Sequence, residues 1–496
     1  AQARPKELAG KPSHPPPATA AATAMRPAAV AVASALGRHS VGRGLHATGR
    51  RSAQRLFGSD AVVAARLPQP PLQPADGLAA VQRLLAAADA AMLPTVELCA
   101  DARVESFLHD FGAMCEGLEP QQLREVMTAF ARAQHMPPAL WHGGFAVEIS
   151  RAVTELPDLH VVHMALLMAA LELRSPAELL QDVAEQLEQR AAALSPTGLA
   201  GAVTALSQLG PWPEPVPGGV VVEEILKSME HLGPRELSAA ALAVATLGLD
   251  NHLFWHTAHG VLLAQVGQLA PRHVADVLLA LATTQLCPIT LLESLQDRLP
   301  HLVPEMDPDE ALTCLWALCA MRLFPIAALS ALLERARLAP EAEFTGIQGN
   351  QLCQVFMSLE LEASAAAARA ALRPELLAWL QGPRQLAGDR SHDLDSEAVD
   401  AVCRLLADEG LAFQLGQLVR DFYIVDVAVK VPSARLVGLL FSDQCSQGAA
   451  GPQDPFAALK GQHLRLLGWS VHWLPFQQWH AWSEEERRGF IRELAA

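Results

Sequence analysis

The sequence predicts a mostly α-helical protein, in which an α-solenoid of helix-turn-helix repeats precedes a small α/β module. The first observation behind this prediction is a regular spacing of six prolines: Pro120, Pro157, Pro196, Pro234, Pro271 and Pro308. The successive gaps between them are 37, 39, 38, 37 and 37 residues. Such a period is typical of stacked supersecondary units, which bury a core between neighbours and expose a long face.

The second observation is an apolar pattern that keeps its register behind every proline. Positions 7 and 10 after the proline are always apolar, as at Leu278 and Leu281. These positions share one face of a helix, and proline suits the first helical turn because its missing N–H needs no partner there. Position 9 is alanine in five of the six copies, which lets a neighbouring helix approach closely.

A second apolar helix is predicted in each unit, for example over residues 289–299 and 326–338. A weaker seventh copy begins near Thr345. We therefore expect units of about 38 residues, stacked over residues 118–380. A large helical bundle with coincidental prolines is the alternative, and the nearly constant gaps argue against it. The proline-rich stretch 210–219 is interpreted as an inter-helix turn within the third unit.

The third observation is a change of pattern near residue 394. Residues 422–430 are predicted as a strand because they are rich in β-branched residues, and the apolar run 436–441 as a second strand. A third strand is predicted over residues 469–475. Helices are predicted over residues 395–409, over 459–467 with Gly468 at the end, and from the N-cap Ser483 onward. Together these elements form a module over residues 395–496.

The remaining boundaries follow from composition. Proline-rich sequence predicts a first linker, and a glycine- and arginine-containing stretch predicts a second. The predicted divisions are 1–57 as a basic arm, 58–78 as a linker, 79–117 as a degenerate N-terminal helical pair, and 381–394 as the second linker.

The first 57 residues differ in charge from the rest of the chain. They carry nine Lys or Arg and one acidic residue, Glu7, which gives a net charge of +8. From Met25 to Phe57 there are six arginines, many Ala and Ser, and no Asp or Glu, a pattern typical of an organellar transit peptide. We expect a mitochondrial location, with the plastid as the alternative. A basic arm that touches nucleic acid directly is the other interpretation.

Subtracting +8 from the total of −16 leaves −24 for residues 58–496. This charge argues against a general polyanion binder, and we expect no DNA partner. No apolar run reaches the length of a membrane span, so no membrane partner is expected either. An RNA contact would need a local stripe of basic groups, and the candidates are Arg124, Arg132, Arg235, Arg272, His273 and Arg322. Solvated residues at helix starts are the alternative interpretation.

Several residues of the module stand in an order and spacing found in a known family. They are Val425-Asp426-Val427, then Leu459, Lys460, Leu464, Leu467, Gly468, Trp469, Val471, Leu474, Pro475 and Trp479. Through them, residues 395–494 resemble the RAP domain, a module of organellar RNA-metabolism proteins. The upstream units look like the octotricopeptide and heptatricopeptide repeats that commonly precede RAP domains, and residues 309–319 are the closest copy.

The resemblance implies a fold similar to restriction-endonuclease-like nucleases, which use strand-end carboxylates to hold a catalytic metal. Asp426 retains one carboxylate, but the family's Glu position is Leu440 and its Asp position is Ser442. Asp443 is a shifted carboxylate that strand alternation turns to the other face. We therefore predict a degenerate nuclease fold with no catalytic residue, metal or cofactor.

Other polar and aromatic groups of the module carry open alternatives. Lys460 and Arg465 are candidate phosphate contacts, with an exposed helix face as the alternative, and Lys430 is a further candidate RNA contact. Four tryptophans offer base stacking, but core packing is the favoured interpretation, and they are Trp469, Trp473, Trp479 and Trp482. The histidine pairs of the helical part, His160 with His163 and His256 with His259, lack a third metal ligand nearby.

The pattern as a whole predicts an organellar RNA-binding repeat protein without enzymatic activity. Its expected partners are ribosomal RNA or a transcript together with ribonucleoprotein subunits, and a component or assembly factor of the mitochondrial ribosome is the concrete version. A protein–protein scaffold without RNA contact is the second hypothesis. A transcript-specific stability factor or a weak ribonuclease is the third.

Overall fold

The computed structural model describes residues 73–90, 95–173, 175–210, 212, 215–339, 346–381, 396–431, 436–442 and 454–495. The predicted basic arm and most of the second linker lie outside these residues. The first linker is shorter than predicted, because residues 74–78 already belong to helix α3 (Pro74–Ala90). Pro74 occupies the first turn of α3 and Asp76 follows in the same turn, both favourable at a helix start.

The N-terminal part contains more helices than the pair that was predicted. Helix α3 is followed by α4 (Thr95–Cys99), α5 (Ala102–Met114) and the 3-10 turn η1 (Cys115–Gly117). Asp101 caps α5, because its side chain accepts the backbone N–H of Arg103 at 2.9 Å.

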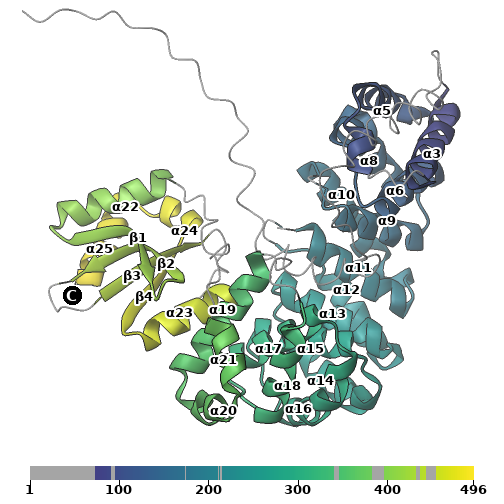
Figure 1. Ribbon diagram of the computed structural model, residues 1–496. Helices are drawn as coiled ribbons and strands as arrows, with labels where there is room; N and C mark the ends of the chain where they lie inside the picture. Colours follow the sequence, from purple (N-terminus) through teal and green to yellow (C-terminus); the bar gives the residue numbers. More distant parts are fainter. Residues whose placement is uncertain are drawn as a thin grey trace, which may run out of the picture.

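Behind this part, one set of helices begins at the repeating prolines. We call it the inner row: α6 (Pro120–Arg132), α9 (Asp158–Ala170), α11 (Pro196–Leu209), α13 (Pro234–Leu247), α15 (Pro271–Thr284), α17 (Pro308–Ala320) and α19 (Gly346–Leu361). Five of the six prolines take the first helical turn as predicted, whereas Pro157 is the N-cap of α9. In Figure 1, α13, α15 and α17 lie toward the inner side of an arc.

The second helices of the units form an outer row: α8 (Ala146–Glu155), α10 (Ala177–Arg190), α12 (Gly219–Ser228), α14 (His252–Gln265), α16 (Ile289–Leu302), α18 (Ile326–Ala336) and α20 (Ala366–Ala371). Short elements complete this region: α7 (Pro138–Leu140), the π-turn η2 (Trp141–Phe145), η3 (Ala191–Ala193), η4 (Met229–His231), η5 (Val266–Gln268), η6 (Val303–Glu305), η8 (Ala363–Ala365) and α21 (Pro374–Gln381).

The predicted apolar register is confirmed by burial. All residues at positions 7 and 10 after the prolines are buried, and Leu278 and Leu281 are 0% and 1% exposed. The alanines at position 9 are 0–2% exposed in α11, α13, α15 and α17. Small side chains at these contacts let consecutive inner helices pack directly on one another along the row.

A left-handed residue ends most inner helices. Positive φ values of 49–67° occur at Gln134, Glu172, Gly248, Gln285 and Arg322. In each case the N–H of the next residue donates to a carbonyl five residues back, as from Leu286 to Leu281 at 3.1 Å. This is the Schellman pattern of helix ends. In unit three, Gly210 at the end of α11 has a φ of −57°, and the proline-rich stretch between α11 and α12 lies partly outside the described residues.

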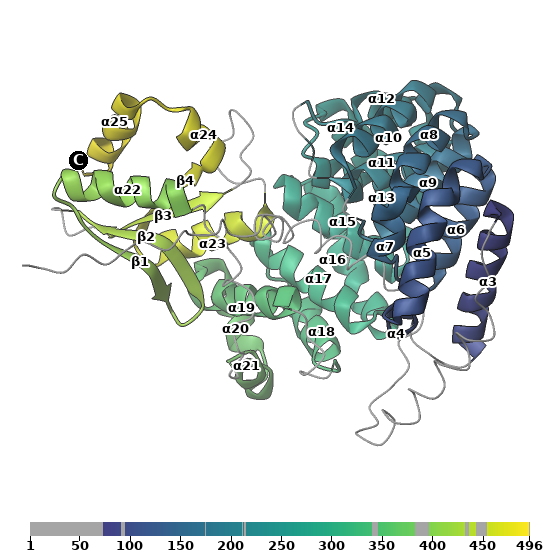
Figure 2. The ribbon, with the colours of Figure 1, turned by 90° about the horizontal axis from the view of Figure 1, so that it is seen from above.

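The C-terminal module is a mixed four-stranded sheet with helices on both faces (Figure 2). Its elements are α22 (Ser396–Asp408), β1 (Ala412–Val419), β2 (Tyr423–Lys430), β3 (Leu436–Ser442), α23 (Pro455–Leu466), β4 (Trp469–Pro475), α24 (Phe476–Ala481) and α25 (Glu484–Ala495). The strand order is β1-β2-β3-β4, with β3 and β4 parallel and the other pairs antiparallel.

Strand β1 and helix α24 were not predicted from the sequence, and α23 starts a turn earlier than expected because Asp454 caps it. Helices α22, α24 and α25 pack on one face of the sheet, and α23 packs on the other. The mostly helical class with a small C-terminal α/β module is therefore confirmed. In the part of the chain that the structure describes, no helix combines the length and apolar character of a membrane span.

Candidate nucleic-acid interface

The inner row presents a narrow stripe of side chains that its core does not bury. In α11 this stripe consists of Thr197, Gly201, Thr204 and Gln208, at positions 1, 5, 8 and 12 after the proline. Steps of four, three and four residues follow one face of a helix, so equivalent positions of neighbouring helices line up along the row. We call positions 1, 5 and 12, from α6 to α17, the inner face. Position 8 is part of it only in α6 and α11, because this position is buried in the other helices, at Ala165, Leu242, Leu279 and Trp316.

The inner face is mostly small and uncharged. Position 5 is occupied in α11, α13, α15 and α17 by Gly201, Ala239, Asp276 and Thr313, and position 12 by Gln208, Thr246, Thr283 and Ala320. The hydroxyls of Thr246 and Thr283 donate to carbonyls four residues back at 2.9 and 2.8 Å. Their oxygen atoms still have capacity to accept hydrogen bonds from a ligand.

Two predicted RNA contacts occupy equivalent positions but differ in availability. Arg235 and Arg272 are the second residues of α13 and α15, as predicted. Arg235 is exposed, whereas Arg272 turns back along its own helix to the buried Asp276, with its Nε 3.1 Å from a carboxylate oxygen. Next to them, His273 accepts the N–H of Ala270 at 3.2 Å, and burial lowers the pKa of His273, assisted by the charge of Arg235.

The other predicted arginines of the helical part also differ in their polar partners. Arg124 lies 3.1 Å from His163 Nδ1, with its Nη1 atom as the donor. Arg322 is exposed, holds the left-handed position after α17 and lies 3.6 Å from Glu362. Arg132 is exposed at the end of α6. Arg132 and Arg235 thus have exposed guanidinium groups and no ion-pair partner among the described residues.

A hollow of about 310 Å³ opens beside Arg272 and carries mostly negative charge. Its lining includes Glu305, Asp307 and Glu310 from the start of α17 and the turn before it. Burial raises the pKa of Asp276 to about 6, against the opposing effect of the Arg272 guanidinium. A basic groove is therefore absent at this point of the described inner face, where carboxylates outnumber guanidinium groups.

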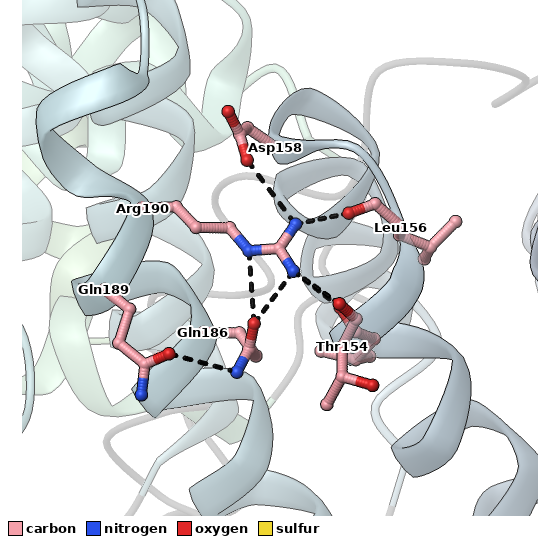
Figure 3. Close-up of polar contacts among 7 residues, drawn as sticks. Thr154, Leu156, Asp158, Gln186, Gln189 and Arg190 are labelled. Atoms are coloured by element: carbon pink, nitrogen blue, oxygen red, sulfur yellow. Dashed lines mark hydrogen bonds and ion pairs between the residues drawn. The ribbon is translucent and has the colours of Figure 1, made fainter.

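A different set of arginines stabilises the turns between units. Arg190, at the end of α10, donates to the backbone oxygens of Leu156 and Thr154 and to the side chain of Gln186 (Figure 3). Its guanidinium also lies 3.4 Å from Asp158, the first residue of α9. The group therefore satisfies carbonyls at the end of α8 and joins both helices of its unit.

Equivalent bonds recur along the outer row. Arg298 of α16 donates to the carbonyl of Leu269 at 2.9 Å, and Arg335 of α18 donates to that of Met306. Both carbonyls belong to the second residue before a repeat proline. We call these side chains the turn arginines. Sequence analysis did not find them, although arginines near the ends of several outer helices were a visible signal.

In the module, the structure places Asp426 inside the sheet. It is 4% exposed, and its carboxylate accepts the backbone N–H of Phe441 at 2.8 Å, across the gap where β2 and β3 diverge. Leu440, at the family's Glu position, is 1% exposed and packs in the core between the sheet and α23. Asp443 lies outside the described residues. Among the residues that are described, no group of three or more His, Cys, Asp or Glu is placed to hold a metal.

The predicted RNA contacts of the module also differ from one another. Lys430 is exposed at the end of β2, and Arg465 is exposed on α23. Lys460 is only 7% exposed, so the exposed helix face considered for it is wrong. It belongs to α23, which packs on both the sheet and α19.

The remaining family-signature residues build the fold of the module. Gly468 ends α23 with a φ of 89°, and Pro475 closes β4. Trp469 and Trp479 are 7% and 1% exposed, in agreement with the favoured interpretation of core packing. Trp473 and Trp482 are half-buried against the two cores.

A buried polar network joins the module to the last inner helix. Gln354 of α19 accepts the indole N–H of Trp316 at 2.7 Å and donates to the carbonyl of Phe456 at 2.9 Å. The rings of Trp316 and Phe456 stack with centroids 4.3 Å apart. These contacts fix α23 against the inner row.

One turn further along α19, His463 of α23 lies between two hydroxyl groups. Its Nδ1 is 2.6 Å from the hydroxyl of Tyr423, the only tyrosine of the chain, and its Nε2 is 3.0 Å from that of Ser358. Burial, assisted by the charge of Arg322, lowers the pKa of His463 to about 3. This network was not predicted from the sequence, because its partners lie 38–105 residues apart.

Comparison with known proteins adds no identity. A scan against protein-family models finds no match, and no curated protein matches the sequence.

Proposed function

We propose that this protein is an organellar RNA-binding repeat protein, built as an α-solenoid with a RAP-type module at its C-terminal end. The observation that supports the proposal most directly is the register of the inner face. Consecutive helices α11, α13 and α15 present polar groups at the equivalent position 12, namely Gln208, Thr246 and Thr283. Helical-repeat proteins that read single-stranded RNA use two or three side chains per unit in this way.

In the proposed mode, bases rather than phosphates provide most of the contacts. The threonine oxygens and the amide of Gln208 accept from, or donate to, base edges, and the small residue Ala239 leaves room for the bases. Arg132 and Arg235 supply the phosphate contacts of this face. Because few phosphates are neutralised, affinity should fall only gently with salt.

This mode fits a subunit of a ribonucleoprotein better than a protein that captures free RNA. The −24 charge of residues 58–496 opposes capture of free polyanion, but it is compatible with a subunit that also contacts basic proteins. A component or assembly factor of the mitochondrial ribosome is the specific form of this proposal. The module acts there as a rigid, non-hydrolytic end piece, because Leu440 stands at the Glu position and Asp426 accepts a backbone N–H within the sheet.

The test uses single-stranded RNA enriched from a random 20-nucleotide pool on the purified full chain. Fluorescence anisotropy then compares wild type with Arg235→Ala and with Gln208→Ala. We expect Arg235→Ala to reduce the salt slope by about one and Gln208→Ala to weaken binding at every salt concentration. The matched control is Arg337→Ala, an exposed arginine at the end of the outer helix α18. Failure to enrich any RNA, or equal effects of Arg235→Ala and Arg337→Ala, contradicts the proposal.

A protein–protein scaffold is the second candidate, and the pairing of Arg272 with Asp276 favours it. The two candidates differ in the material that co-purifies from isolated organelles with and without RNase. Ribosomal RNA with a set of ribosomal proteins supports the first. Protein partners that persist after RNase, with no RNA enriched, support the scaffold.

A further inference from the structure

Four outer helices each begin with a large, exposed aliphatic side chain. The residues are Val220, Leu253, Ile289 and Ile326, which are 45%, 63%, 71% and 44% exposed. Each is the first or second residue of its helix, α12, α14, α16 and α18. We call this set the aliphatic ridge. Exposed aliphatics normally occur singly and scattered, whereas these four recur within the first two residues of consecutive outer helices.

The four residues form a continuous row. Helices α12, α14, α16 and α18 pack in sequence against one another, and α14, α16 and α18 lie side by side on the outer side of the arc (Figure 1). Because the units repeat, these helices run in the same direction and their starts are neighbours. Packed helices are usually about 8–10 Å apart, so a row of four helix starts in the more loosely packed outer row is at least about 25 Å long.

The surroundings of the ridge are acidic. Glu223 and Glu293 are exposed and lie one helical turn after Val220 and Ile289, on the same face. Asp250 is exposed three residues before Leu253. The basic residues nearby in sequence have acidic partners. Arg322, four residues before Ile326, lies 3.6 Å from Glu362. Lys227, seven residues after Val220, lies 2.6 Å from Glu224.

We propose that the ridge binds an extended segment of another protein, with an aliphatic side chain at every third residue and lysine or arginine between them. In a polyproline II conformation, residues three apart project from the same side at about 9 Å spacing, which matches the spacing of packed helices. The acidic groups along the ridge complement the basic residues of such a segment. This inference does not depend on the proposed RNA function.

The test uses a fluorescent peptide of four Lys-Pro-Leu repeats and the purified full chain. Two control peptides separate the contributions of charge and of the aliphatic side chains. One has Glu in place of Lys, and the other has Ser in place of Leu. We expect saturable binding of the first peptide and binding at least about tenfold weaker for the other two.

Two variants locate the site. The variant Leu253→Gln/Ile289→Gln should weaken binding about tenfold or more, with unchanged thermal unfolding, because both side chains are exposed. The control Leu159→Gln/Leu338→Gln changes two equally exposed leucines away from the ridge, which are 61% and 65% exposed, and should retain the affinity.

Four outcomes overturn the proposal. They are absence of saturable binding to the Lys-Pro-Leu peptide, equal binding of the Glu peptide, equal affinity of the ridge variant and wild type, and sedimentation that shows a wild-type dimer lost in the ridge variant. The last would identify a second copy of this chain as the occupant. RNA affinity, measured on the same variants, reports separately on the inner face.

Discussion

The inner and outer rows of helices differ in how much of each helix the fold uses. Helix α15 of the inner row buries nine of its 14 residues, whereas α14 of the outer row buries four of its 14. The inner helices lie between two close neighbours and an outer partner. The outer helices are less closely packed against each other. The comparison teaches that stability is concentrated in the inner row and that surface chemistry is concentrated at the edges of the outer one.

This division has a physical cause in side-chain size. Alanines such as Ala243 and Ala280 let inner helices approach closely, and a curved stack must be tighter on its inner side. Larger side chains are accommodated on the outer side, where they remain exposed, as at Ile289. The inner face keeps only a narrow stripe for ligand contacts.

The largest effect is expected from a cavity in the inner row. Leu278→Ala removes a side chain that is 0% exposed and should lower the free energy of unfolding by about 2–5 kcal/mol. Ile289→Ala, at a residue 71% exposed, should change it by less than about 0.5 kcal/mol. Urea unfolding followed by circular dichroism measures both. Similar losses in the two variants would mean that the rows do not differ in this way.

A smaller effect is expected from the turn arginines of the outer row. Arg298→Met keeps much of the side-chain length but leaves the carbonyl of Leu269 without its donor, which should lower the free energy of unfolding by about 1–3 kcal/mol. Arg337→Met, at an exposed arginine of α18, is the matched control and should be nearly neutral. Hydrogen exchange of the turn around Leu269 provides a local measurement. Unchanged protection there would argue against a stabilising role of this turn arginine.

Much of this fold follows from local sequence, and the prediction fails where contacts are distant. The prolines and the apolar positions behind them predict the inner row because helix starts and helix periodicity are local properties. The edge strand β1 was missed because Leu415 and Leu418 are exposed, so its pattern does not distinguish a buried face. The exposed helix face considered for Lys460 was wrong, because α23 lies between the sheet and α19, and α19 precedes it by about 100 residues.

The candidate site was predicted less completely than the fold. Sequence spacing places Arg235 and Arg272 at one position of adjacent helices, but it does not reveal that Asp276 holds only the second of them. The burial of Asp426 in the sheet likewise depends on the divergence of β2 and β3, which leaves the N–H of Phe441 available to its carboxylate.

A pH-dependent effect is expected where the inner row meets the module. His463 has a folded pKa of about 3, below the ordinary value of 6.5. Between these values the unfolded chain binds the additional proton, so this group makes stability fall as pH decreases from 6.5. The slope is at most about 1.4 kcal/mol per pH unit.

Unfolding of His463→Gln at pH 7 and pH 5 should lack this contribution, whereas His256→Gln, at an exposed histidine, should retain it. Equal pH slopes in all three proteins would exclude the effect.

The smallest effect has the opposite sign and lies on the inner face. The folded pKa of Asp276 is about 6, above the ordinary value of 3.8, because burial disfavours its charged form more than Arg272 favours it. Between pH 3.8 and 6 the folded state binds the additional proton, so Asp276 contributes stability that is lost as pH rises through 6. Asp276→Asn should therefore gain about 1 kcal/mol at pH 7.5 and little at pH 4.

Asp250→Asn, at an exposed aspartate near the outer row, provides the control and should show no such pH-dependent difference. A loss of stability in Asp276→Asn at pH 7.5 would show that the ion pair with Arg272 outweighs the burial of the carboxylate. Released from that pair, Arg272 has the same exposure to ligand as Arg235 in the neighbouring unit. The variant should then also steepen the salt dependence of RNA binding by about one, because a second guanidinium is free to meet phosphate. A gain in stability without that change would place Asp276 in the packing of the inner row alone.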